Sequence, residues 1–159
     1  MNITATPIET WNDGAAAAVG KIMDFPKQPS AIILAELRLA FTYLEGSFSR
    51  NEESLSLHWA GVGRIAYRYA ANTGHGFTPQ ELIDTLVRKQ RDYGHNNILR
   101  FGTYGVIVRC HDKIARLEHL AFKGTEPQNE SMKDNLLDVA GYAAIGIMLN
   151  NGWFEKELE

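Results

Sequence analysis

The sequence predicts an all-α fold, an antiparallel helical bundle of about five helices. Apolar residues recur at three- and four-residue intervals through several long segments, which is the spacing of one helix face. The connections between these segments are short and contain glycine or proline, as in a bundle of antiparallel neighbours. The best strand candidate is 106–108, but helical spacing continues through it. At 159 residues, the chain has the length of one domain.

Composition narrows the class of protein. The chain is 45% hydrophobic and 22% charged, with a formal net charge of −3, so we expect no direct nucleic-acid binding. The single cysteine, Cys110, excludes an intramolecular disulfide and argues against a cysteine metal site. The N-terminus lacks the pattern of a signal peptide, and the apolar segments are too short to span a bilayer. A cytoplasmic protein without a membrane partner is expected.

Residues 1–29 show weak periodicity, with turn signals at Asn12-Asp13-Gly14 and Phe25-Pro26. We expect an N-terminal arm here, loosely structured, that packs on the main body or on a second subunit. Residues 30–159 are then expected to form a single helical domain. Because the first half of the chain is apolar, we also expect a homo-oligomer.

The helical pattern begins at Ser30 and stops at Gly46, and a second amphipathic stretch runs from about Glu52 to Asn72. The third helix has the clearest start. Thr78-Pro79-Gln80-Glu81 supplies an N-cap hydroxyl, a proline at the first helical position and a reciprocal glutamate. This helix should end near Gly94.

A loop containing Asn96, Asn97 and Phe101-Gly102 is expected next. The fourth helix then covers about 103–123, and 124–127 break the chain. The fifth helix runs from about Asn129 to Asn150.

Asp138 is the most informative polar residue, because it interrupts an apolar run from Leu136 to Leu149. A carboxylate in such a place must be paired, protonated or bound to a metal. At about 100° per residue, Glu130, Asp134 and Asp138 fall within an arc of about 80°. Gly141 would leave space beside them. The alternative is a solvated acidic stripe at a helix N-terminus, which suits Glu130 better than Asp138.

On the fourth helix, Arg109, Asp112 and Arg116 share one face. The simple explanation is an ion pair between Asp112 and Arg116 on a solvated surface. The functional alternative is that this face looks across a cleft at Asp134 and Asp138. Asp112 would then add a metal ligand, and Arg109, Lys113 or Arg116 would neutralise phosphate oxygens. Mg²⁺ suits such a site, since it bridges carboxylates to phosphates, and Mn²⁺ is possible.

The segment that contains Lys89, Asp92, Tyr93 and Asn97 is predicted to be a helix end that turns into a loop. A C-cap explains Gly94 fully. It does not require the other polar residues, so a loop that contacts ligand is the alternative.

His111-Asp112 also invites comparison with HD-type metal-dependent phosphohydrolases. The upstream histidines would be His58, His75 and His95, with Asp134 or Asp138 downstream. The sequence has neither a GxxxxGK[ST] phosphate-binding loop nor a dinucleotide GxGxxG motif.

Three ordered motifs in the C-terminal half resemble the phage and bacterial family called nucleotide modification associated domain 1. This is a MazG-like relative of the all-α NTP pyrophosphohydrolases. The motifs are Lys89-x-x-Asp92-Tyr93-Gly94, Gly105-Val-Ile-Val-Arg109-x-x-Asp112-Lys113-x-x-Arg116-Leu117, and Glu130-x-x-x-Asp134-x-x-x-Asp138-x-x-Gly141-Tyr142.

The resemblance implies that 30–159 is a helical nucleotide-binding domain of an oligomeric, Mg²⁺-dependent hydrolase, which converts a (d)NTP to (d)NMP and pyrophosphate. It also implies a role in phage nucleotide metabolism, and then a location in the host cytoplasm. The superfamily's usual EExxE and ExxD helices are not evident, and Glu52-Glu53 lacks the third acid. A nucleotide-binding module without catalysis is therefore the alternative.

The predicted site follows from the motifs and the helical faces together. The expected catalytic residues are Asp112, Asp134 and Asp138, and the expected metal ligands are these three with Glu130. The expected substrate-binding residues are Lys89, Asp92, Tyr93, Asn97, Arg109, Lys113 and Arg116.

Overall fold

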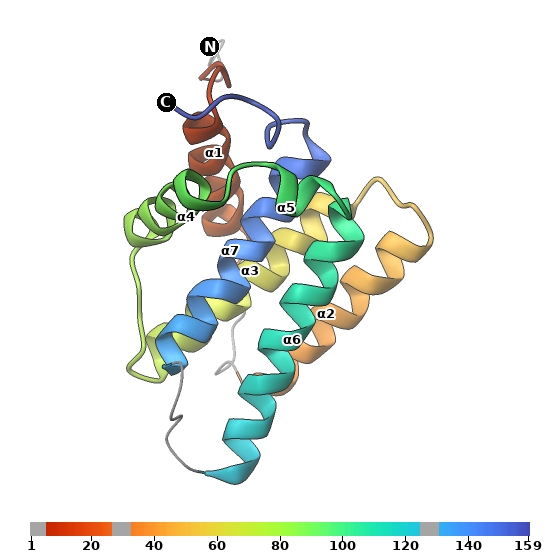
Figure 1. The fold of residues 1–159 in the computed structure, drawn as a ribbon. Helices are drawn as coiled ribbons and strands as arrows, with labels where there is room; N and C mark the ends of the chain where they lie inside the picture. The colour runs from red at the N-terminus through yellow and green to blue at the C-terminus, as the bar shows by residue number, and fades with distance from the viewer. Residues whose placement is uncertain (1–5, 27–32, 125–130) are drawn as a thin grey trace.

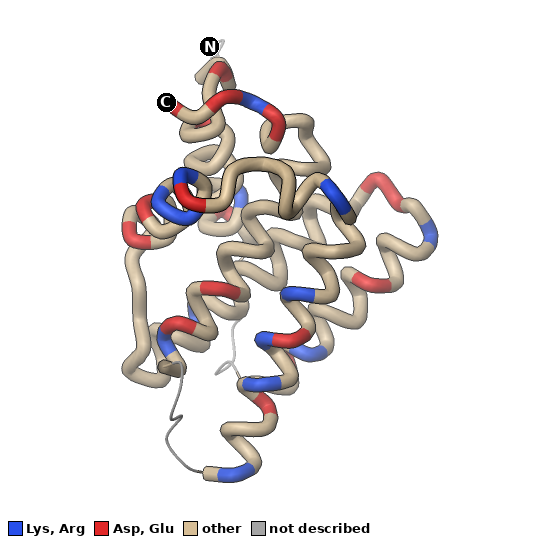
Figure 2. Tube along the Cα trace, viewed as in Figure 1, with Lys and Arg blue, Asp and Glu red and all other residues tan. Residues whose placement is uncertain are grey.

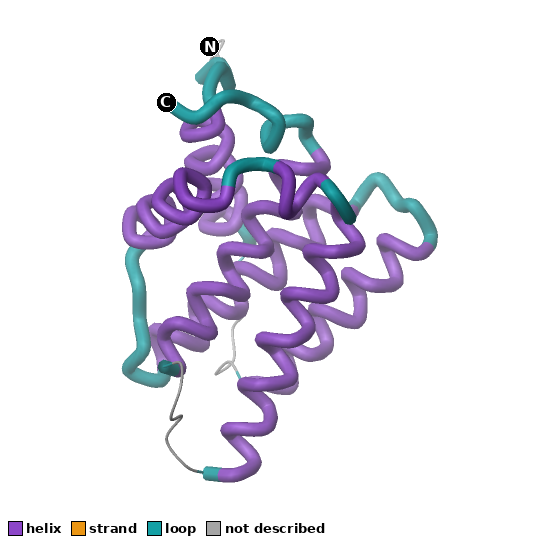
Figure 3. Tube along the Cα trace, in the orientation of Figure 1, coloured by secondary structure: helices purple, strands orange, loops and turns teal. Residues whose placement is uncertain are grey.

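A computed structural model describes residues 6–26, 33–124 and 131–159, and every secondary-structure element in these ranges is a helix (Figures 1 and 3). The all-α prediction is therefore confirmed. The helices are α1 (Trp11–Asp24), α2 (Leu34–Ser49), α3 (Leu55–Asn72), α4 (Pro79–Tyr93), α5 (Asn96–Leu99), α6 (Gly102–Lys123) and α7 (Met132–Asn150).

Helix α7 is the centre of the arrangement. It packs against α3 and α6 over most of its length, and α2 contacts both α3 and α6, so these four helices form a bundle with antiparallel neighbours (Figure 1). Helices α1 and α4 pack against each other and against the remaining side of α7. The bundle thus leaves α4 and α6 on either side of α7, an arrangement that matters for the site described below.

The five expected helices correspond to α2, α3, α4, α6 and α7. The start of α4 follows its sequence signal: the Thr78 hydroxyl accepts from the Glu81 backbone N–H, and the Glu81 carboxylate accepts from the Thr78 N–H. Gly94 follows the helix with φ +67°, which favours glycine. The expected start of the last helix, at Asn129, lies outside the described residues. Within them, Ser131 caps α7 by accepting from the Asp134 N–H.

The segment expected to be a loosely structured arm contains α1, so the expected loose structure is wrong. The expected packing on the main body agrees with the contacts of α1 with α3, α4 and α7. Asn12-Asp13-Gly14 forms no turn but lies in the first turns of this helix. Thr10 and Asp13 form a capping box, and Trp11, Ala15 and Ile22 are buried in the common core. The C-terminal tail holds the start of α1, because the Trp11 N–H donates to the Glu157 carbonyl at 2.8 Å. Helix α1 therefore shares the core of the other helices.

The second difference is α5, a single short helix inside the loop expected after α4. It buries Ile98 against the core and contacts α6. As a result, Asn97 is fixed next to α6 instead of lying on an open loop.

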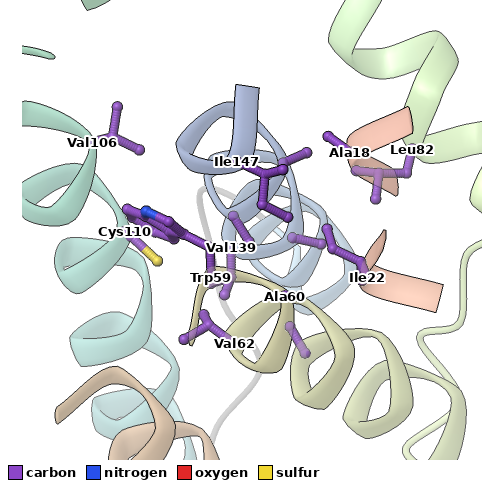
Figure 4. Close-up of a cluster of buried hydrophobic side chains, with 14 of the residues drawn as sticks. Ala18, Ile22, Trp59, Ala60, Val62, Leu82, Val106, Cys110, Val139 and Ile147 are labelled. Atoms are coloured by element: carbon purple, nitrogen blue, oxygen red, sulfur yellow. The ribbon is translucent and has the colours of Figure 1, made fainter. Parts of the chain in front are cut away.

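The core is tightest where α3 meets α7. Trp59 of α3 is completely buried, and a Cβ on Gly146 of α7 would lie only 2.2 Å from the Trp59 ring. Also on α3, a Cβ on Gly63 would lie 3.1 Å from Ala143 of α7 and 2.8 Å from the Ile22 side chain of α1. Figure 4 shows Trp59 and Ile22 within this cluster, together with Cys110 and Val139. The sequence thus needs glycine here so that the two helices can approach closely.

Among the described residues, no helix combines the length and apolarity that crossing a membrane requires.

Candidate functional site

A cleft of about 390 Å³ lies between α4 and α6, with α7 as its floor. Helix α1 contributes Trp11 and α5 contributes Asn97 and Ile98 at one end. The charged residues that line the cleft are Lys89 from α4, Arg109 and Lys113 from α6, and Asp138 from α7. Figure 2 shows basic residues along α6 and acidic residues on the neighbouring α7. A cleft with three cations and one carboxylate favours an anionic ligand.

Asp138 is held by lysines from both walls. Its Oδ1 accepts from Lys89 Nζ at 2.6 Å, and its Oδ2 accepts from Lys113 Nζ at 2.9 Å. The Asp138 side chain is only 10% exposed, whereas those of Lys89 and Lys113 are 49% and 23% exposed. The prediction that this carboxylate needs a partner is thus met by two ammonium groups. The same pairs tie α4 and α6 to α7 across the cleft.

The charge state of Asp138 follows from these contacts. Burial opposes ionisation, but hydrogen bonds from Lys89 and Lys113 outweigh it, so the pKa of the Asp138 carboxyl lies below its ordinary value. Asp138 is therefore a carboxylate at neutral pH and a weak proton acceptor. Near it, burial and then the Asp138 charge raise the pKa of the Tyr142 hydroxyl, which stays protonated and can donate a hydrogen bond.

Six of the predicted site residues line this one cleft. They come from four helices and are Lys89, Tyr93, Asn97, Arg109, Lys113 and Asp138. Arg109 also links α6 to α5, since its Nη2 lies 3.5 Å from the Asn97 carbonyl oxygen. Five of the seven predicted substrate-binding residues therefore line the cleft.

The predicted carboxylate cluster is not brought together by the described residues. Asp112 and Asp134 are exposed and do not line the cleft, and the same holds for Asp92 among the substrate-binding residues. Arg116 also lies outside the lining, although it has interactions of its own. Glu130 lies outside the described residues. Of the predicted acids, Asp138 is thus the one that the described cleft contains.

These side chains do not fit a resident metal ion held by protein ligands alone. In the described ranges, no three His, Cys, Asp or Glu residues lie close enough together to hold a metal. This applies equally to the HD-type alternative, in which His111 and Asp112 would have to meet further ligands. His111 instead packs on Phe41, with ring centroids 5.4 Å apart. A magnesium nucleotide, which brings its own phosphate ligands, needs only one or two carboxylates, and Asp138 can provide one.

Several residues of the cleft were missed in the sequence. Tyr142 follows Asp138 by one helical turn, and this spacing was sufficient to place it on the same face. Thr85 precedes Lys89 by one turn and is found by the same rule. No sequence spacing indicated Gln90 or Trp11. Gln90 is a polar residue that the fold buries, and Trp11 belongs to α1, which the sequence analysis did not predict.

Cys110 does not belong to the site. It is fully buried in the core, and burial raises the pKa of its thiol, so it is a packing residue.

Comparison with known proteins finds no matching protein-family model, no significantly similar curated protein and no significantly similar solved structure. Function is therefore inferred from the cleft and the sequence motifs alone.

Proposed function

We propose that the cleft binds a nucleoside triphosphate and that the protein hydrolyses it to the monophosphate and pyrophosphate. The observation that carries this proposal is that three sequence motifs meet in one cleft. Each of the three motifs that resemble the nucleotide pyrophosphohydrolases contributes to the lining of one cleft: Lys89 and Tyr93 from the first, Arg109 and Lys113 from the second, and Asp138 from the third.

The charges of the cleft suit a phosphate chain. Lys89 and Lys113 approach from opposite walls, and each contacts one oxygen of Asp138, so that two ammonium groups share one negative charge. Phosphate oxygens accept the same kind of charge-assisted hydrogen bond, so a polyphosphate can take over one or both ammonium groups. Arg109 adds a third cation one turn along α6 from Lys113.

In the proposed reaction, water attacks the α-phosphorus, the bond to the bridging oxygen breaks, pyrophosphate leaves, and the proton of the attacking water passes to solvent. Lys89, Lys113 and Arg109 stabilise the charge that develops on the leaving group. When lysine contacts shift to the phosphates, Asp138 is released to orient the water or to contact magnesium of the substrate. Magnesium bound to the nucleotide would further neutralise the phosphate oxygens.

The direct test is to incubate the purified protein with each of the four dNTPs and Mg²⁺, and to assay pyrophosphate and monophosphate. We expect both products in equal amounts. Asp138→Asn should abolish product formation while the far-ultraviolet circular dichroism of the bundle is retained. Full activity in that variant would remove Asp138 from the mechanism.

A nucleotide-binding module without catalysis is the second candidate. It is favoured by one observation: within the described residues, Asp138 has no second carboxylate beside it in the cleft, and lysines hold both of its oxygens. Nucleotide binding without product in the same assay would select this candidate. If neither binding nor product were found, both candidates would be wrong.

A further inference from the structure

The cleft has two chemically different ends. One end carries Lys89, Lys113 and Asp138 at a single level of the bundle, as their ion pairs show. The other end lies toward α5, where Asn97 and Ile98 join the lining. The proposed phosphate contacts occupy the first end and leave the second without an assigned role.

Helix geometry separates the ends by about the length of a nucleotide. On α4, Tyr93 lies one turn beyond Lys89, or about 6 Å along the axis. On α7, Ile145 lies two turns beyond Asp138, or about 10 Å. Arg109 lies between the two ends, because it precedes Lys113 by one turn of α6 and contacts the backbone of Asn97. A ligand whose phosphates meet the lysines therefore extends toward Tyr93 and Asn97.

Tyr93 presents an aromatic surface at this second end. Its side chain lines the cleft, yet the residue is 67% exposed, so much of it is not covered by the protein. An exposed aromatic ring beside a cationic phosphate site provides a stacking surface for a nucleobase. The buried Ile98 and Trp11 supply an apolar wall at the same end.

The wall beside Tyr93 also carries amide groups. The Asn97 side-chain oxygen is buried and lacks a hydrogen-bond partner among the described residues. Gln90 is 8% exposed and is fixed by its contact with His95, at 2.8 Å between Nε2 and Nδ1. A buried acceptor without a partner is costly, and an N–H group of a ligand that reaches Asn97 would relieve this cost.

We propose that this second end is a subsite for the base of the nucleotide, in which Tyr93 stacks on the base and Asn97 binds its edge. This inference rests on the proposed function, and it names the substrate class as a nucleoside polyphosphate and not a bare polyphosphate. Tyr93 and Asn97 would then contribute to affinity only when a base is present, whereas Lys89 and Lys113 contribute to both classes of ligand.

The test compares binding of dATP, dTTP and inorganic tripolyphosphate by isothermal titration calorimetry at one fixed salt concentration. The variants are Tyr93→Ala and Asn97→Ala. Tyr104→Ala is the matched control, because Tyr104 is 62% exposed but stacks on Phe48 and does not line the cleft.

We expect Tyr93→Ala to weaken dATP binding about tenfold, from the loss of one stacked base. Asn97→Ala should weaken it about fivefold, from the loss of one hydrogen bond. Neither variant should change the affinity for tripolyphosphate. Tyr104→Ala should change the affinity for neither dATP nor tripolyphosphate.

The outcomes distinguish this inference from the proposed function. If the wild type bound tripolyphosphate as tightly as dATP and dTTP, or if Tyr93→Ala and Asn97→Ala bound dATP normally, the base subsite would be overturned while the phosphate site remained. If the wild type bound none of the three ligands, the proposed function itself would fail, and the subsite with it.

Discussion

Gly141 and Gly146 lie on the same helix, α7, but face different surroundings. A Cβ on Gly146 would lie 2.2 Å from the ring of the completely buried Trp59, whereas a Cβ on Gly141 would meet only Leu86, at an ordinary 3.5 Å. Gly146 belongs to the packed face toward α3, and Gly141 lines the cleft between α4 and α6. One helix therefore has a face in which close packing decides the sequence and a face that is left open for polar side chains.

The comparison shows why a carboxylate is tolerated in the middle of an apolar helix. Asp138 lies on the open face, where two lysines from neighbouring helices can reach it and the lysines themselves remain partly in solvent. An acid at the position of Gly146, on the face toward α3, would meet the buried Trp59 ring and would be far more costly.

The largest expected effect comes from substituting the two glycines. Gly146→Ala should lower the free energy of unfolding by about 3 kcal/mol, because the rigid Trp59 ring cannot move aside in a packed core. Gly141→Ala should change it by less than about 1 kcal/mol, since the added methyl has room and alanine favours the helix. Urea denaturation of both variants measures the difference. Equal losses would mean that the two faces of α7 are packed alike.

A smaller effect is expected for Asp138→Asn. Loss of the two charge-assisted hydrogen bonds should lower the free energy of unfolding by about 1–2 kcal/mol at pH 7. Asp134→Asn on the same helix is the control, and it should cost less because Asp134 is exposed.

The Asp138 contribution should also depend on pH. Because the folded pKa of Asp138 lies below its ordinary 3.8, the stabilisation is present above that value and is lost as the pH falls through the folded pKa. The wild type and Asp138→Asn should therefore differ at pH 7 and converge in strong acid. A difference that stayed constant down to pH 2 would contradict this assignment of the ion pairs.

The smallest effect is expected for the ion pair between Arg38 and Glu118, which joins α2 to α6 and does not line the cleft. Both side chains are about a third exposed, so solvent screens the pair. Glu118→Gln should cost about 0.5 kcal/mol by urea denaturation. It should leave nucleotide affinity unchanged. A change in affinity would show that α6 transmits effects from this side to the cleft.

Periodicity and capping were sufficient to predict most of the fold. The Thr78–Glu81 capping box located α4 almost to the residue, because both cap interactions are local. Helix α1 was missed although Thr10 and Asp13 form the same kind of box. Half of its buried residues are glycine or alanine, which give a weak apolar stripe, and Asn12-Asp13-Gly14 resembles a turn out of context.

The site was partly predictable for a similar reason. Asp138 was found because a charge inside an apolar run must have a partner, and this reasoning is local. Which partner it has depends on how three helices meet. Asp112 and Lys113 are adjacent in sequence, yet Lys113 lines the cleft and Asp112 is exposed outside it. Helical periodicity does not predict which of two consecutive residues faces the cleft.

The most direct measurement is the affinity of Lys113→Gln for dATP in the presence of Mg²⁺, by isothermal titration calorimetry. Lys133→Gln is the matched control, since Lys133 is on α7 but pairs with Glu81 outside the cleft lining. If the cleft holds the phosphates, Lys113→Gln should bind dATP at least about tenfold more weakly than the wild type, and Lys133→Gln should bind it equally well. Wild-type affinity in Lys113→Gln, or equal losses in both variants, would contradict a phosphate site between α4 and α6.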